Sequence, residues 1–78
     1  MKAIMLIVVE PEKLENVCKN LAKIKEITKV YEITGEFDIF IEIDVESIEV
    51  FRKTLKEEIL KIPGIRMTQS SVVLGEWK

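Results

Sequence analysis

The chain has 78 residues, of which 47% are hydrophobic and 33% charged, and its net charge at pH 7 is −2. This length fits one small domain over residues 1–78 and leaves no room for a second. The negative net charge argues against a general nucleic-acid binder, and a single cysteine excludes an internal disulfide. A domain of this size buries only about 60% of its unfolded surface, so we expect oligomerisation to add stability.

The hydrophobic residues do not form a membrane segment. The longest apolar run, from Ala3 to Val9, has seven residues, whereas a membrane-spanning helix needs about 20. The run also lacks the length and cleavage site of a signal peptide, so we expect a cytoplasmic protein. Abundant Lys and Glu, no His and one Gln favour a thermophilic source.

The first half of the chain predicts a strand, a helix and two further strands. The run from Ala3 to Val9 is typical of a strand buried on both faces. Pro11 suits the first turn of a helix, and an apolar residue recurs every three or four positions after it, which predicts an amphipathic helix over 11–25. Period-two alternation predicts a strand over about 37–45, and we expect another strand over about 27–34, before the turn at Thr34-Gly35-Glu36.

The second half predicts one helix and one strand. Ser47 is a candidate N-cap, and the helix after it presents one apolar face, made of Ile48, Phe51, Leu55, Ile59 and Ile62. Pro63-Gly64 ends this helix, Ile65 to Leu74 form the fourth strand, and 75–78 form a short extension.

The element order β-α-β-β-α-β predicts an α+β domain of the ferredoxin-like class. The two halves also repeat weakly at an offset of 38, since each has a helix that ends in Lys-Ile and a strand that opens with Ile. In this fold both helices cover one face of a four-stranded antiparallel sheet, and strands one and three are central.

The other face of this sheet should carry Phe40 and alternate residues of Ala3–Val9. Soluble monomers avoid exposing an apolar patch of this kind. Each such side chain contributes about 1.5–3 kcal/mol when it is buried. We therefore expect the sheets of two subunits to pack face to face in a dimer.

Catalytic chemistry is poorly represented in the chain. There is no His for a Ser-His or Cys-His pair, and no glycine-rich phosphate loop. Cys18 lies on the apolar stripe of the first helix and is expected in the core. Asp38, Glu42 and Asp44 alternate with core residues on a strand, so they predict a solvated face and no metal site. We expect no enzyme, no metal and no cofactor.

Two polar segments are candidates for a ligand site. One is the hairpin Thr34-Gly35-Glu36-Phe37-Asp38, and the other is Thr68-Gln69-Ser70-Ser71 in the fourth strand. Gly35 is expected at positive φ, where its missing side chain lets a ligand approach the backbone. Asp38 could accept from an ammonium group, and free turn N–H groups could bind a carboxylate. The segments thus predict an α-amino-acid site, lined by both and placed at a subunit junction. The alternative is that the fourth strand is an edge strand with a solvated middle.

The hairpin, the Lys61-Ile62-Pro63-Gly64-Ile65 corner and Thr68–Leu74 together resemble the C-terminal effector-binding (RAM) domain of the Lrp/AsnC, or feast/famine, transcription regulators. The resemblance covers essentially the whole chain. It implies dimers that associate into rings, commonly octamers, with amino acids bound between dimers by the same nine residues, 34–38 and 68–71. No helix-turn-helix segment precedes the first strand, so the chain resembles stand-alone members that bind no DNA. It could then modulate full-length regulators by co-assembly.

Two other functions fit the same sequence. A structural module could assemble into rings without any ligand, driven by the same apolar sheet face. A small dimeric monooxygenase of ferredoxin-like fold has the right size, but the chain offers it no His and no acid–base pair.

Overall fold

The chain follows the predicted order of strands and helices. The computed structural model describes residues 1–78. Its elements are β1 (Lys2–Val9), a 3-10 turn (Pro11–Lys13), α1 (Leu14–Leu21), β2 (Ile27–Glu32), β3 (Ile39–Asp44), α2 (Ile48–Thr54) continued by a π turn (Leu55–Ile59), and β4 (Ile65–Val72).

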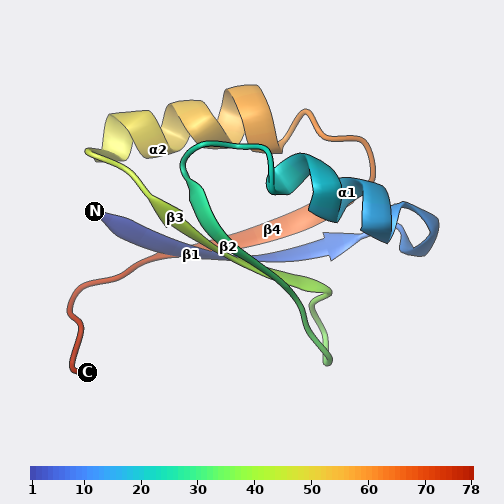
Figure 1. The fold of residues 1–78 in the computed structure, drawn as a ribbon, viewed down its shortest axis with the longest axis horizontal. Coiled ribbons are helices and arrows are strands. Elements are labelled where there is room, and N and C mark those ends of the chain that lie inside the picture. Colours follow the sequence, from blue (N-terminus) through green and yellow to red (C-terminus); the bar gives the residue numbers. More distant parts are fainter.

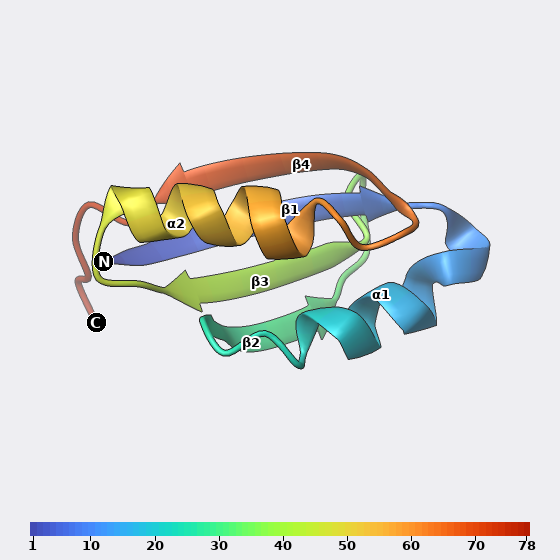
Figure 2. The same ribbon diagram turned by 90° about the horizontal axis from the view of Figure 1, so that it is seen from above.

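The four strands form one antiparallel sheet in the order β2-β3-β1-β4, so the first and third strands are central, as predicted. Both helices lie on the same face of this sheet (Figure 1). Seen from above, α2 lies over β1 and α1 lies beside β2 (Figure 2). This arrangement confirms the α+β, ferredoxin-like prediction.

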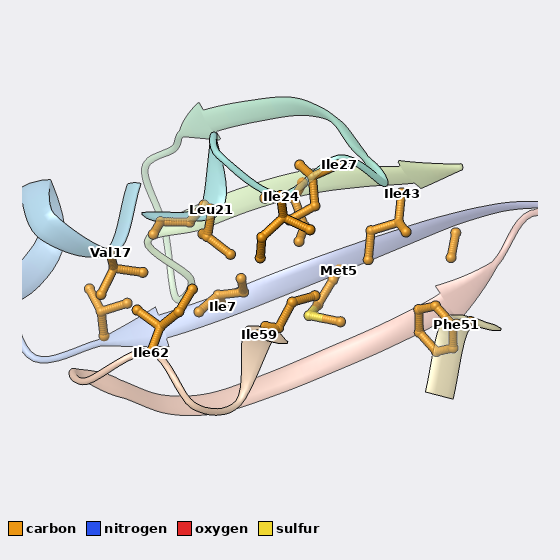
Figure 3. Packing of buried hydrophobic residues seen from close by; sticks show 14 of the residues in the cluster. Met5, Ile7, Val17, Leu21, Ile24, Ile27, Ile43, Phe51, Ile59 and Ile62 are labelled. Carbon is orange, nitrogen blue, oxygen red and sulfur yellow. The ribbon is translucent and has the colours of Figure 1, made fainter. Parts of the chain in front are cut away.

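The core fills the space between the sheet and the two helices. Its side chains come from alternate positions of the central strands and from one face of each helix (Figure 3). Met5, Ile7, Leu21, Ile41 and Ile59 are among those with no exposed surface. The core therefore depends on period two in the strands and on the helical period in α1 and α2.

The continuous apolar run of β1 is buried on one face only within the chain. Ala3, Met5, Ile7 and Val9 point towards the helices and are buried, whereas the residues between them are half-buried. The expectation of a strand covered on both faces is therefore not met by a single chain, because both helices lie on the same side.

The first helix is shorter than predicted. It is helical from the 3-10 turn at Pro11 to Leu21, and residues 22–26 then form a turn. Within that turn the Ile24 N–H donates to the Leu21 carbonyl over 3.1 Å, and the Ile27 N–H donates to the Ile24 carbonyl over 3.2 Å. The early end lets both Ile24 and Ile27, the first residue of β2, reach the core.

The second helix begins where predicted, because the Ser47 hydroxyl accepts from the Val50 N–H over 3.3 Å. It contains a π turn, in which the Leu60 N–H donates to the Leu55 carbonyl over 2.9 Å. The predicted apolar face is wrong at Ile48, which is 45% exposed. Thr54 is buried instead.

The corner after α2 requires glycine, as the Pro63-Gly64 pair indicated. Gly64 has a φ of +104°, and a Cβ placed there would lie 2.7 Å from the Cβ of Lys13. Its carbonyl also accepts from the Glu10 N–H over 2.8 Å. The corner thus holds the start of the first helical segment against the start of β4.

We use the term open face for the sheet surface that the helices leave uncovered. Register places one row of four side chains across it, one from each strand: Tyr31, Phe40, Leu6 and Gln69. The Tyr31 and Phe40 rings lie 6.0 Å apart between centroids. Ile4 and Val8 flank this row on β1, so the open face is apolar at its centre, as expected from the sequence.

Candidate ligand-binding site

The β2–β3 hairpin ends in a loop that requires a glycine. The Ile33 N–H donates to the Asp38 carbonyl over 2.9 Å and closes the loop. Gly35 has a φ of +106°, as predicted, and nothing lies within 4 Å of the position its Cβ would take. The loop hangs on the side of the sheet away from the helices (Figure 1). Thr34, Gly35 and Glu36 are exposed, so their backbone groups are open to a ligand.

Asp38 is tied to the end of β1 by two hydrogen bonds. Its N–H donates to the Ile7 carbonyl over 2.9 Å, and its Oδ2 accepts from the Val9 N–H over 2.9 Å. This half-buried carboxylate therefore has a structural role that the sequence did not reveal. A carboxylate has two oxygens with about four acceptor positions, so Oδ1 remains available to an ammonium group.

The polar residues of β4 divide between the two faces of the sheet. Thr68 and Ser70 pair with Ile7 and Met5 of β1, whose side chains point towards the helices. Gln69 and Ser71 pair with Leu6 and Ile4, so they lie on the open face. Directly opposed residues share a face. At most two of the four side chains on this strand can therefore line one site. The sequence already implied this, because successive side chains of a strand point to opposite faces.

The hairpin and the polar part of β4 are separated within one chain. Asp38 follows the hairpin on the β3 side of β1, whereas Thr68 lies on its other side. Two strand spacings amount to about 10 Å, and Ser71 lies about 10 Å further along the strand. Among the four polar residues of β4, Thr68 is thus the nearest to Asp38 in a single chain. The nine predicted site residues do not line one common cavity in a single chain.

The cleft that the chain does contain lies elsewhere. It has a volume of about 500 Å³ and is lined at the other end of the sheet by Met1, Lys25, Glu26, Asp44, Val45, Glu46 and Val50. The N-terminal amine donates to the Val45 carbonyl over 2.6 Å and lies 3.8 Å from an Asp44 oxygen. None of the predicted site residues lines this cleft.

The single cysteine and the acidic side chains are the remaining groups to consider for chemistry. Cys18 is half-buried against the core, as expected. Burial, and secondarily the negative charge of Glu32, raise the pKa of its thiol above the ordinary cysteine value. Both effects favour the neutral thiol over the thiolate, which is the reactive form. No group of three or more His, Cys, Asp or Glu side chains is arranged to hold a metal ion. Neither helix is long and apolar enough to cross a membrane.

Known structures with this fold include regulators of transcription. A protein from Thermus thermophilus superimposes with a TM-score of 0.93 at 18% identity, over 99% of this chain and 96% of that one. Escherichia coli AsnC gives 0.92 at 25% identity, over 96% of this chain and 51% of its own. A transcriptional regulator from Neisseria meningitidis, solved in complex with L-Met, gives 0.91 at 23% identity, over 99% and 51%.

Proteins of similar sequence are also transcriptional regulators. An uncharacterized HTH-type transcriptional regulator from Pyrococcus furiosus is 32% identical over 71 residues, and one from Pyrococcus abyssi is 34% identical over 71 residues. Both matches cover 91% of this chain, and the chain spans about half the length of these relatives, 48% and 45%. Residues 2–78 also match the family model of the Lrp/AsnC ligand binding domain. The chain therefore belongs to the Lrp/AsnC family and corresponds to the ligand-binding domain of that family.

Proposed function

We propose that this domain binds a free α-amino acid as a regulatory effector, between the hairpin of one subunit and the polar residues of β4 in a neighbouring subunit. The observation that carries the proposal is the hairpin itself. Gly35 leaves its backbone open, and Asp38 holds a fixed carboxylate beside it. The open N–H groups suit the carboxylate of an amino acid, and Asp38 suits its ammonium group.

A shared site is supported by the distance between the two segments. Hairpin and β4 are about two strand spacings apart in one chain, which is too far for both to contact one small zwitterion. An assembly of subunits would supply the missing half of the pocket. The apolar open face favours such an assembly, first as a dimer of stacked sheets and then as a ring, of which an octamer is one form.

The proposed role is regulatory and not catalytic. The curated relatives are transcriptional regulators, and the matched family model is a ligand binding domain. Through the same assembly contacts the domain would join full-length regulators in the cytoplasm and adjust their response to the effector.

The proposal is tested by calorimetric titration of the assembled protein with the twenty amino acids, beginning with L-Met because a Neisseria relative is known as an L-Met complex. The informative variant is Asp38→Asn. Its side-chain carbonyl can still accept from the Val9 N–H, whereas the negative charge that would pair with the ammonium group is gone. We expect at least about a tenfold loss of affinity with an unchanged melting temperature.

Two double variants locate the other half of the site. Thr68→Ala with Ser70→Ala removes the hydroxyls on the helix side, and Gln69→Ala with Ser71→Ala removes the polar groups on the open face. If the site is shared, two variants that fail to bind alone should complement each other. Mixing the Asp38→Asn protein with a non-binding β4 variant then restores binding at those junctions where an intact hairpin meets an intact β4. No heat with any amino acid, from a protein shown to be assembled, would refute the proposal and leave the ring-forming structural module.

A further inference from the structure

The last residues of the chain carry two large apolar side chains that touch nothing. We call Leu74–Trp77 the C-terminal arm. Leu74 and Trp77 are each 100% exposed, whereas no other exposed large hydrophobic residue exceeds 53%. Large apolar groups left in water in one short segment mark an interaction site.

The arm is held only at its base. The last backbone hydrogen bond between β4 and β1 is donated by the Val73 N–H to the Lys2 carbonyl over 2.9 Å, and residues 74–78 make none. Lys2 Nζ lies 3.5 Å from Glu76 Oε1, but the Glu76 side chain is largely exposed and that of Lys2 partly so, and such surface pairs contribute little to stability. The direction of the arm is thus set by β4, while its apolar side chains have no partner within the chain.

The arm leaves the sheet on the side of the open face. Figure 1 shows the C-terminus on the side of the sheet opposite the two helices, at the end where the chain begins. Leu74 follows directly on Val73, which lies beside Lys2 at the first pair of β1. The arm therefore extends the apolar open face beyond the edge of the sheet. No strand of the same chain lies there to cover the side chains of the arm.

We infer that the C-terminal arm packs against a second copy of this chain, placing Trp77 and Leu74 on the subunit whose sheet covers the open face. The inference rests on the stacked dimer proposed above and adds a second contact to it. In a two-fold dimer the contact occurs twice, since each subunit gives one arm and receives one. A Trp side chain buries about 150–250 Å² at such a contact and has a low conformational cost.

Trp77 is the only Trp in the chain, so its fluorescence reports on the arm alone. We expect its emission maximum to be blue-shifted at concentrations where sedimentation shows dimers, and to move to the red on dilution in step with dissociation. Trp77→Ala is expected to raise the dimer dissociation constant by about tenfold or more, which is 1.4 kcal/mol per factor of ten. Leu60→Ala is the matched control, because Leu60 is an exposed apolar residue directly after the π turn, on the helix side of the sheet, and its substitution should leave the constant unchanged.

Two results would overturn the inference while leaving effector binding intact. One is a dimer whose dissociation constant is the same for the wild type, Trp77→Ala and Leu74→Ala. The other is a blue-shifted emission that persists in the monomer, which would place the arm on its own sheet. A wild type that stays monomeric at all concentrations would also overturn it, together with open-face assembly. The calorimetric titration with amino acids tests the ligand site independently of the arm.

Discussion

At the scale of single residues, Asp38 shows how one side chain can serve two purposes. One of its oxygens accepts the N–H at the end of β1, and this bond fixes the position of the charge beside the hairpin. Removing the whole side chain, as in Asp38→Ala, would leave the Val9 N–H without its partner as well as removing the charge. Asp38→Asn is therefore the better probe of binding, because it separates the charge from the bond.

The two glycines at positive φ are predicted to differ in their tolerance of alanine. Gly35→Ala must adopt an unfavourable φ, which costs about 1–3 kcal/mol, but its Cβ meets open space. Gly64→Ala has the same backbone strain and also places its Cβ 2.7 Å from that of Lys13. We expect urea unfolding to show a larger loss of free energy of unfolding for Gly64→Ala. Equal losses would mean that the backbone segment carrying Lys13 shifts without cost.

At the scale of elements, the second helix differs from a simple 3.6-residue pattern. The apolar spacing from Ile48 to Ile62 predicted one continuous buried stripe, but the buried stripe begins only at Phe51, and a π turn interrupts the regular helix at Leu55–Ile59. Ile59 and Ile62 reach the core, whereas Ile48, at the first turn, does not. Isoleucine is thus exposed at the start of this helical segment, at Ile48, and buried near its end, at Ile59.

Alanine substitutions at the two isoleucines test this description. Ile59→Ala leaves a cavity in the core and is expected to lower the free energy of unfolding by about 2–5 kcal/mol. Ile48→Ala removes a half-exposed side chain and should change it by no more than about 0.5 kcal/mol. Chemical denaturation of both variants measures the difference. A large loss at Ile48 would mean that another subunit covers the start of α2.

Sequence periodicity was sufficient for the elements and for their arrangement. It predicted the order, the two central strands, the Ser47 cap and the glycine corner, because each of these depends on local patterning. It missed the early end of α1 and the exposure of Ile48, since both depend on how a helix sits on the sheet. It also missed the Asp38–Val9 bond, which joins residues 29 positions apart.

At the scale of the whole molecule, the helices cover one face of the sheet and leave the open face uncovered, which is the surface that we propose for assembly. Leu6 lies at the centre of the open face, between Phe40 and Gln69 on the neighbouring strands. Leu6→Glu would place a charge at the middle of a stacked interface without entering the core. Burial of an unpaired charge strongly opposes association.

We therefore expect Leu6→Glu to fold and to sediment as a monomer of 9.0 kDa at concentrations where the wild type is dimeric. Leu60→Glu, which adds the same charge at an exposed position directly after the π turn, should remain dimeric. A dimeric Leu6→Glu protein would show that the open face is not the contact between subunits.

The central position of β1 also affects how the domain is made. Ala3 is paired with Ile43 on one side and with Val72 on the other, so the first of the four strands to be synthesised has its final neighbours much later in the sequence. Until β3 and β4 have left the ribosome, eight residues of β1, nearly all aliphatic, remain without a partner. Unpaired apolar strands are prone to aggregate. Folding of this domain is accordingly completed only after β4 emerges, and until then the nascent chain exposes an apolar strand that can aggregate.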